Sequence, residues 1–438
     1  MTGRRAAHRP RTRAPARETA RIESIAAGGA GVARLAGGAA VFVPHTAPGE
    51  LVEIEVDTSA RPATGRVLRV IEPSAERVTP PCPYVEACGG CDFMHLSAHA
   101  QAEAHAAIVR SALAHALHGA TLPAIEVHAA PASLAYRTRA RLFLRAHRGR
   151  AQVGYRAPGS HDLTAVDVCA VLDPAIGALL TELPRVLAGA AGEGDAHVAL
   201  GRGGLPVVSI AWHGDLAAST WAALDAKITG GAWAGARVAL HGAGAPATFG
   251  DPRPVLAGAD GAPLVLAPGG FAQPSDAGAA LIARRADELS RLDQKERPRH
   301  VVELFAGSGA LSVLLARGAA SFTAVEIDLE ACAAARQNLG DRGLAARVVA
   351  ADAESFALPA GAGVVVLDPP RTGAPSAAKA IAASSARVVV YVACDPPTLA
   401  RDLATMTTGR LAITHLETVE LFPQTSHVET LVRLERRR

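Results

Sequence analysis

Long hydrophobic runs are absent from the sequence, and no stretch approaches the roughly 18 uninterrupted apolar residues that would indicate a membrane span. The composition is that of a globular protein, with 49% hydrophobic and 19% charged residues among the 438. That length exceeds what one hydrophobic core usually holds, and the usual size of roughly 100–200 residues per domain predicts two to four domains. We therefore expect a multidomain protein with no membrane partner.

A large excess of charge of either sign is also missing, because the net charge is only +3. Basic character is local: the first 21 residues contain seven arginines and one acidic residue, Glu18. No apolar run follows them, so they do not read as a secretory signal, and we expect a cytoplasmic protein. Residues 1–16 are predicted to be a disordered basic arm, which either binds phosphates or is simply a solvated end.

Cysteine is scarce as well, and six thiols in a long cytosolic chain favour metal-binding or catalytic roles over disulfides. Cys82, Cys88 and Cys91 lie within ten residues, and Cys169 is the natural fourth ligand. Structural zinc sites usually combine two close pairs, whereas a 4Fe-4S cluster accepts three grouped ligands and one distant ligand more readily. We therefore predict an iron–sulfur cluster, with zinc or uncoordinated thiols as alternatives. Cys332, inside a predicted helix, is expected to be buried and inert.

Three domains are predicted after the arm. In residues 17–77, alternating apolar segments separated by glycine and proline turns indicate an OB-like β-barrel, a fold that often holds single-stranded nucleic acid. Residues 78–255 contain the cysteine-rich loop, a helix and a mixed β-rich central region. From about residue 298 strands and helices alternate, so residues 256–438 are predicted to form an α/β domain with a mostly parallel sheet covered on both faces. Its cleft should lie at the carboxyl ends of the strands.

A glycine turn follows the first strand of this α/β domain, where Gly307 and Gly309 precede a helix. Such a turn lets backbone N–H groups approach an anionic group at the positive helix end. Glu326, 19 residues after Gly307, ends the next strand, where a carboxylate can bind both hydroxyls of a ribose. Together they predict a nucleoside cofactor, with a dinucleotide as the alternative. Asp352 could face an adenine, and Asp368, fixed by two prolines, suits a cofactor ammonium or a base edge.

Cys394 comes directly after a predicted buried strand and just before a helix. A helix N-terminus stabilises a thiolate, so we expect Cys394 to be a nucleophile rather than a packing residue. Glu429, in the closing strand, is the candidate base. Its pattern alone fits an exposed strand carboxylate better, so its role depends on the resemblance that follows.

The motifs resemble those of the RNA uracil-5-methyltransferases, specifically the branch with a TRAM domain and an iron–sulfur cluster that includes enzymes of 23S ribosomal RNA. The matching pieces span nearly the whole chain in the family's order: Cys82-x5-Cys88-Gly-Gly-Cys91, Tyr136-Arg137, Phe271-Ala-Gln273, Gly307-x-Gly309, Asp368-Pro-Pro-Arg371, Cys394-Asp-Pro-x-Thr398-Leu-Ala-Arg-Asp402 and Phe422-Pro-x-Thr-x-His427-x-Glu429. This ordered set is far more specific than any single motif.

The resemblance implies a TRAM barrel, a class I (Rossmann-like) methyltransferase domain, and S-adenosylmethionine-dependent methylation of a uridine at carbon 5. Carbon 5 of uracil is too weak a nucleophile to take a methyl group directly, so Cys394 would first add to carbon 6. Glu429 would then remove the proton from carbon 5. The residues expected to bind the cofactor are Gln273, Phe305, Gly307, Glu326, Asp352 and Asp368.

The sequence departs from the family pattern at three positions near the cofactor. Ser275 and Ala310 stand where the family usually has Asn, and Ala306 stands where it usually has Cys. These changes bear on the fine geometry of cofactor binding and leave the reaction class intact.

RNA is the implied partner, with 23S ribosomal RNA favoured and transfer RNA not excluded by the catalytic motifs. Arg137, Arg139 and Arg141 could hold the RNA backbone or be ordinary solvated charges. Two rivals from other classes are an oxidoreductase built on the same nucleotide-binding fold and a non-catalytic RNA-binding protein. Nothing implies a protein partner, and we expect a monomer.

Overall fold

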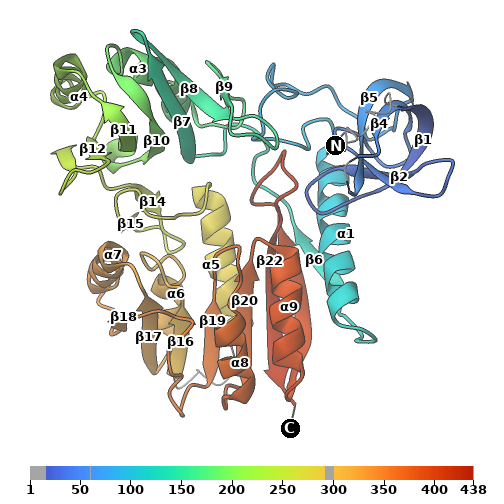
Figure 1. The fold of residues 1–438 in the computed structure, drawn as a ribbon. Helices are drawn as coiled ribbons and strands as arrows, with labels where there is room; N and C mark the ends of the chain where they lie inside the picture. The colour runs from blue at the N-terminus through green and yellow to red at the C-terminus, as the bar shows by residue number, and fades with distance from the viewer. Residues whose placement is uncertain (1–15, 60, 292–299, 438) are drawn as a thin grey trace, which may run out of the picture. The chain divides into compact units, whose positions relative to one another are not determined.

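The structure, a computed structural model, describes residues 16–59, 61–291 and 300–437 (Figure 1). Apart from Ala16, the predicted basic arm lies outside the described residues. The chain divides into two compact units, one of residues 1–79 with 95–97 and the other of residues 80–94 with 98–438. The domain boundaries at residues 77 and 255 stay predictions.

The first unit contains a closed β-barrel, as predicted, with the strand order β1-β2-β3-β5-β4. Burial alternates along its strands: Val52, Ile54 and Val56 of β4 point into the barrel, while Glu53 and Glu55 face outward. The period of two puts one apolar face inside and one charged face in water. The strands are β1 (Ala16–Ile25), β2 (Gly31–Arg34), β3 (Ala40–Val43), β4 (Leu51–Asp57) and β5 (Ala63–Glu72).

A seven-stranded sheet forms the central part of the second unit, in the order β13-β12-β11-β10-β7-β8-β9. Helices α2 (Pro174–Gly177), α3 (Leu179–Val186) and α4 (Ala218–Thr229) contribute apolar side chains to its core, in which Trp212 and Trp233 are buried. The strands are β7 (Arg139–His147), β8 (Arg150–Arg156), β9 (Leu163–Ala165), β10 (Ala191–Leu200), β11 (Pro206–Asp215), β12 (Gly235–Leu240) and β13 (Ala247–Gly250). A short 3-10 helix, Arg202–Gly204, joins β10 to β11, and the hairpin β14 (Val255–Ala257) and β15 (Pro263–Val265) follows β13.

An eight-stranded sheet forms the C-terminal part, in the order β18-β17-β16-β19-β20-β22-β21-β6. Strands β16 to β20 pair in parallel, whereas β22 is antiparallel to both of its neighbours. The strands are β16 (His300–Leu304), β17 (Ser321–Glu326), β18 (Arg347–Ala350), β19 (Val364–Leu367), β20 (Val388–Ala393), β21 (Leu411–Val419) and β22 (Glu429–Arg436). The predicted α/β domain is therefore confirmed in its class.

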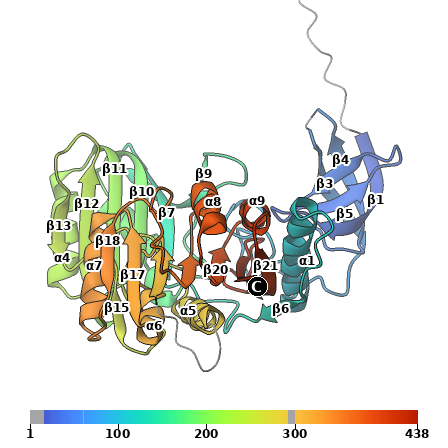
Figure 2. The ribbon, with the colours of Figure 1, turned by 90° about the horizontal axis from the view of Figure 1, so that it is seen from below.

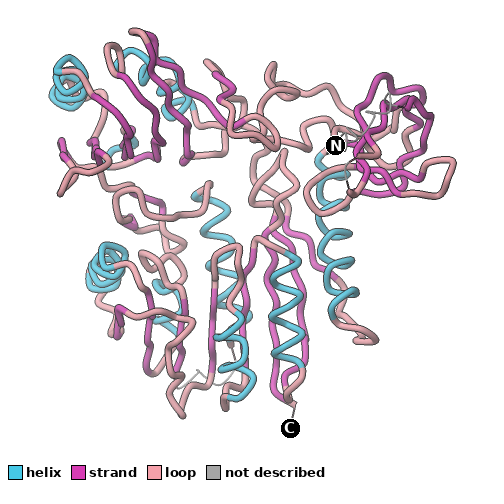
Figure 3. Tube along the Cα trace, viewed as in Figure 1, coloured by secondary structure: helices cyan, strands magenta, loops and turns pink. Residues whose placement is uncertain are grey.

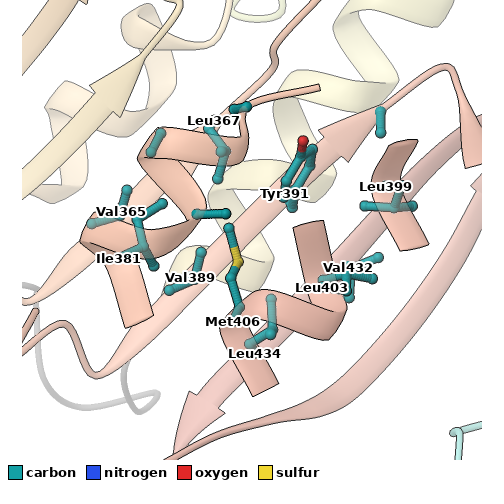
Figure 4. Close-up of a cluster of buried hydrophobic side chains, with 14 of the residues drawn as sticks. Val365, Leu367, Ile381, Val389, Tyr391, Leu399, Leu403, Met406, Val432 and Leu434 are labelled. Carbon is teal, nitrogen blue, oxygen red and sulfur yellow. The ribbon is translucent and has the colours of Figure 1, made fainter. Parts of the chain in front are cut away.

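Helices cover both faces of this sheet, because its inner strands are apolar on both sides. Helices α1 (Ala98–Ala116), α8 (Pro375–Ala383) and α9 (Pro396–Thr407) pack on one face, and α5 (Asp276–Ser290), α6 (Ser312–Gly318) and α7 (Leu329–Gly340) pack on the other. Figure 2 shows α8 and α9 on one side of β20 and α5 on the opposite side. In Figure 4, Tyr391 and Val389 of β20 pack against Leu403 and Met406 of α9. Burial of each such side chain contributes roughly 1.5–3 kcal/mol.

The edge strand β6 (Ile125–His128) comes from far away in the sequence. It pairs in parallel with β21, so this stretch of the predicted central region completes the C-terminal sheet. Residues 80–94, all of them described, carry three of the cysteines and form turns and loop without a helix or strand (Figure 3). None of the helices within the described ranges combines the length and apolar character needed to cross a membrane.

Candidate active site

The candidate residues meet at one edge of the C-terminal sheet. Strands β16, β17, β19 and β20 run in parallel, so their carboxyl ends share that edge. The chain reaches Gly307 just after β16, Glu326 at the end of β17, Asp368 directly after β19 and Cys394 directly after β20. The structure therefore brings together four residues that the sequence placed at separate strand ends.

Glu429 joins this group from the antiparallel strand. The outermost pair between β20 and β22 is Ala393 with Thr430. Cys394 is the next residue after Ala393, and Glu429 is the residue before Thr430, so the two functional side chains are neighbours across the strands. The negative charge of Glu429 accordingly contributes to a raised pKa of Cys394.

The glycine turn is built from residues in the left-handed region of backbone conformation, where glycine carries no steric penalty. Gly307 has φ 54° and Gly309 has φ 89°, while Phe305 adopts φ 62° despite its side chain. Glu326 fastens the turn, because its Oε2 accepts a hydrogen bond from the Gly307 N–H at 2.8 Å. Its Oε1 accepts from the Asp328 N–H at 2.8 Å, so both oxygens face the turn and its flanking loop.

Asp352 lies two residues beyond β18 and is exposed. Its Oδ1 accepts a hydrogen bond from the Glu354 N–H at 3.0 Å. The neighbouring Ala351 N–H donates to the Glu326 carbonyl at 2.9 Å, which ties this loop to the end of β17. Two large apolar side chains close by along the chain are exposed, Ile327 by 67% and Leu329 by 73%. Sequence reasoning did not single out this apolar surface beside Glu326.

Asp368 and Gln273 face each other at the cleft. The Gln273 Nε2 donates to Asp368 Oδ2 at 3.5 Å, and Gln273 Oε1 is buried with no hydrogen-bond partner within the described part of the chain. Burial raises the pKa of Asp368 to about 7. Arg139 of β7 holds the Gln273 segment, because its Nη1 donates to the Gln273 carbonyl at 2.5 Å and its Nη2 to Asp276 at 2.6 Å.

The arginines predicted as RNA-backbone contacts are already engaged. Arg139 is buried in the interactions just described, and Arg141 pairs with Asp195 at 3.0 Å. Arg137 donates to the Tyr136 hydroxyl at 3.1 Å. That these three side chains hold the RNA backbone stays a prediction, and the sequence of a strand did not reveal the protein partners that reach them from elsewhere.

Cys394 is half-buried and precedes Asp395, the N-cap of α9, whose side chain accepts from the Thr398 N–H at 2.9 Å. Burial and the carboxyl groups of Glu429 and Asp368 raise the pKa of Cys394 to about 12, while the Arg371 cation opposes them. The expectation that the helix N-terminus makes this thiol acidic is therefore wrong for the free protein. Desolvation and two nearby acids outweigh the helix end.

Glu429 is buried, with 1% of its surface exposed. Neither carboxyl oxygen has a hydrogen-bond partner within the described ranges. Burial and the charge of Asp368 raise the pKa of Glu429 well above its ordinary value. A buried carboxyl group without partners destabilises the folded protein. Glu429 is therefore not the exposed strand carboxylate that its sequence pattern alone indicates.

A second buried acid, Glu303, lies within β16 and was missed as a functional candidate. Its Oε2 accepts a hydrogen bond from Ser312 Oγ at 2.5 Å, and burial raises the pKa of Glu303 to about 8. The signal in the sequence was a single acid among the apolar residues Val301, Val302 and Leu304 of the strand. Glu303 connects β16 to the start of α6 directly beneath the glycine turn.

The cysteines Cys82, Cys88, Cys91 and Cys169 line one cavity, together with Arg137 and other residues. All four are free thiols. Burial raises the pKa of Cys88, and it raises the pKa of Cys91 to about 12. Within the described ranges, no three of their sulfur atoms lie within 4.8 Å of one another. Cys332 is buried in α7, as expected.

One carboxylate–histidine group, Glu126, His128 and Glu417, has the spacing of metal ligands at the β6 edge. Arg285 donates to both oxygens of Glu417, at 2.5 and 2.9 Å. The arginine cation supplies the positive charge that a metal would otherwise provide, so this group forms an ion-pair network.

Family models match two parts of the chain, and known proteins match most of its length. Residues 16–68 match the TRAM domain family, and residues 287–399 match the family described as conserved hypothetical protein 95. The chain is 35% identical to a 23S rRNA (uracil(1939)-C(5))-methyltransferase of Chromohalobacter salexigens, over 95% of this chain and 88% of that protein. It is 33% identical to the enzyme of the same name from Pseudomonas putida, over 94% of this chain and 92% of that protein.

Among solved structures, the chain resembles a tRNA (uracil-54, C5)-methyltransferase of Pyrococcus abyssi in complex with S-adenosyl-L-homocysteine, with a TM-score of 0.74. The match covers 95% of this chain and 100% of that one at 19% identity. This likeness establishes a shared fold.

Proposed function

The chain belongs to the RNA uracil-5-methyltransferase family and is an enzyme of that class, and we propose that it methylates carbon 5 of a uridine in 23S ribosomal RNA through a covalent adduct with Cys394. The adjacency of Cys394 and Glu429 across β20 and β22 supports this most directly. A nucleophile and a base side by side are what addition to carbon 6 and proton removal from carbon 5 require. An oxidoreductase on the same fold would have no use for that pair.

S-adenosylmethionine, when bound, supplies a methyl group on a sulfonium, and several features of the site suit it. The Gly307 turn leaves room for close backbone approach, and Glu326 is held where ribose hydroxyls can donate to it. Asp352 and the exposed Ile327 and Leu329 offer polar and apolar contacts to an adenine. Gln273 Oε1 lacks a donor, which a ligand in the cleft could supply. Phe305, the residue after β16, completes the proposed cofactor contacts.

The reaction begins at the Cys394 thiol, which is protonated at neutral pH. Asp368, whose charge acts on this thiol, would accept the proton while the sulfur bonds to carbon 6, because the two pKa values make an earlier, separate transfer unfavourable. The displaced electron pair moves to the carbon 4 oxygen. The resulting enolate makes carbon 5 nucleophilic, so it would take the methyl group from S-adenosylmethionine, whose methyl–sulfur bond breaks to leave S-adenosylhomocysteine.

Glu429 completes the cycle. It removes the proton from carbon 5, the double bond between carbons 5 and 6 reforms, and the Cys394 thiolate leaves. The thiolate regains its proton from Asp368, and Glu429 releases its proton to solvent. Burial makes an ionised Glu429 a strong base, and its two unpartnered oxygens leave it free to face the substrate.

Substrate RNA would be bound by stacking as well as by charge. Phe271, two residues before Gln273, is 80% exposed, which suits stacking on a base that has left its helix.

The barrel offers less free charge to RNA than its composition suggests. Several of its arginines pair with glutamates, namely Arg21, Arg34, Arg66, Arg69 and Arg77. We propose that the Arg-rich residues 1–16 supply phosphate contacts that the barrel strands do not. The enzyme would act in the cytoplasm as a monomer.

The four cysteines would hold a 4Fe-4S cluster rather than zinc. The four thiols line one cavity from two separate segments of the chain, and a 4Fe-4S cluster takes three grouped ligands and one distant ligand more readily than zinc does. The cluster would be bound by Cys82, Cys88, Cys91 and Cys169. Its positive irons would ionise these thiols, although burial raises the pKa of Cys88 and Cys91 in the free protein.

The choice of RNA is tested by assaying the purified enzyme with S-adenosylmethionine on unmodified 23S ribosomal RNA and on unmodified transfer RNA. Mass spectrometry of digested RNA should detect 5-methyluridine only in the ribosomal RNA. Methylation of transfer RNA alone would keep the chemistry and replace the substrate. The absence of 5-methyluridine from both would contradict the proposed function.

A further inference from the structure

The position of Glu429 is set by its backbone rather than by its carboxyl group, which has no hydrogen-bond partner within the described part of the chain. On one side, Thr430 pairs with Ala393 of β20. On the other side lies the loop of residues 420–428, which joins β21 to β22. Glu429 itself pairs with Val419 of β21, so the strand pairing holds its backbone on one side and the contacts of this loop hold it on the other.

Asp92, the residue after Cys91, holds the loop at Ser426. Its Oδ1 accepts a hydrogen bond from the Ser426 N–H, and its Oδ2 accepts one from Ser426 Oγ, both at 2.6 Å. Next to it, the Phe93 N–H donates to the Gln424 carbonyl at 2.9 Å. Hydrogen bonds to a carboxylate are stronger than those between neutral groups. The cysteine-bearing segment is thus bonded to the loop three residues before Glu429.

Helix α1 holds the same loop from a second direction (Figure 1). Gln101 Oε1 accepts from the Gln424 N–H at 2.7 Å, and Gln101 Nε2 donates to Gln424 Oε1 at 3.1 Å. His105 is buried between Glu420 Oε2 and the Thr425 carbonyl, each at 2.8 Å. These contacts fix the early part of the loop, whereas Asp92 fixes the part nearest to Glu429.

A third contact leads from the loop back to the four cysteines. The Tyr136 hydroxyl donates to the Pro423 carbonyl at 3.0 Å. Its neighbour Arg137 lies 5.9 Å from the centre of the Phe422 ring and lines the cavity of the four thiols. The cysteine cavity and the loop therefore share several side chains.

We propose that Asp92 is a positioning residue for the general base, fastening the loop before Glu429 to the cysteine-bearing segment. Asp92 acts through Ser426, and a group bound by the cysteines would restrain Asp92 in turn. This inference rests on the proposed function, because it gives Asp92 a part in the step that releases the adduct.

The experiment separates adduct formation from release. In 5-fluorouridine RNA the fluorine at carbon 5 cannot be removed as a proton, so the adduct accumulates without any need for Glu429. We expect Asp92→Ala to form this adduct within about twofold of the wild-type rate. With ordinary RNA its kcat should fall roughly 10- to 100-fold at unchanged KM, as expected for a small misplacement of a catalytic group. Equal losses in both assays, or no loss in either, would overturn the inference.

Two variants serve as matched controls. Asp92→Asn keeps an oxygen for the Ser426 N–H and an amide that can donate to Ser426 Oγ, so it should restore turnover to near the wild-type value. Ser426→Ala keeps the backbone bond and should give an intermediate loss. If Asp92→Asn were as impaired as Asp92→Ala, the hydrogen bonds would not be what matters.

Hydrogen–deuterium exchange gives a readout that does not depend on activity. Asp92→Ala and Cys91→Ser should both raise exchange in residues 422–428, while the exchange of β16 and β19 stays unchanged. Unchanged exchange in the loop would overturn the inference. Glu429→Gln, assayed with ordinary RNA, distinguishes a failure of the inference from a failure of the proposed function. If Glu429→Gln accumulates adduct and Asp92→Ala does not, the inference alone fails. If neither variant accumulates adduct, the proposed base fails.

Discussion

Cys394 and Glu429 stand opposite each other, one residue beyond the outermost pair of the antiparallel strands β20 and β22. One side chain comes from the end of a strand and the other from the start of its neighbour. This register brings a nucleophile and a base to the same point of the sheet edge, and Asp92 holds the loop that precedes the base. Burial raises the pKa of both groups, and the charge of Glu429 adds to the raised pKa of Cys394.

Glu429→Gln should separate the two halves of the reaction. Glutamine fills the same space but cannot take the proton from carbon 5, so the adduct with ordinary RNA should form and then decay slowly. We expect turnover to fall by roughly 100-fold or more. Gel electrophoresis under denaturing conditions would detect the protein–RNA species, and rapid turnover by this variant would remove Glu429 from its role.

The charges around Cys394 should control its reactivity toward iodoacetamide. Asp368 raises the pKa of the thiol, so Asp368→Asn should lower it and speed alkylation several-fold, since the thiolate fraction changes tenfold for each pKa unit. Because the pKa of Asp368 is about 7, this advantage should appear as pH rises through about 7 and vanish below it. Arg371→Gln should slow alkylation, because it removes the cation that favours the thiolate. Equal rates for Asp368→Asn and the wild type at about pH 8 would contradict this electrostatic assignment.

Glu303 should make stability depend on pH. Its pKa rises from an ordinary 4.5 to about 8 in the folded protein. The contribution of protonated Glu303 to the free energy of unfolding is therefore fully present below about pH 4.5 and is lost as pH rises through about 8. Glu303→Gln carries no charge at any pH and should be the more stable protein above about pH 8, by roughly 3–5 kcal/mol. Urea unfolding at several pH values would measure the difference. Parallel pH profiles for the two proteins would show that Glu303 is not protonated in the native state.

The cysteine cavity should load with iron and sulfide when the protein is prepared without oxygen. We expect about four irons and four sulfides per chain, and Cys91→Ser or Cys169→Ser should lose both together with the visible absorption band. Cys332→Ser is the matched control, because that thiol lies inside α7 and should leave the iron content unchanged. One zinc per chain and no iron would contradict the cluster.

The pattern of neighbouring residues in the sequence was sufficient to predict the parallel sheet that carries the candidate site. The strand Val364–Leu367 is a continuous apolar run that is buried throughout, as expected of a parallel strand covered on both faces. The Gly307 turn and Glu326 were likewise readable from spacing. These features depend on neighbours in the sequence.

Features that depend on distant pairing were not readable. The strand Ile125–His128 is only four residues long, and its membership of the C-terminal sheet depends on pairing with β21. Asp92 gave no signal, because its partner Ser426 is 334 residues away. The burial that raises the pKa of Cys394 also comes from tertiary packing, which is why a helix N-terminus alone predicted the wrong direction.

The most direct test is intact-mass spectrometry of the protein after incubation with S-adenosylmethionine and a 5-fluorouridine version of its RNA. We predict a species whose mass is the sum of protein, RNA fragment and one methyl group, with the fragment mapped to Cys394 by digestion. In Cys394→Ala this species should be absent, and methylation of ordinary RNA should fall to background. Methylation at the wild-type rate by Cys394→Ala would contradict covalent catalysis by this thiol.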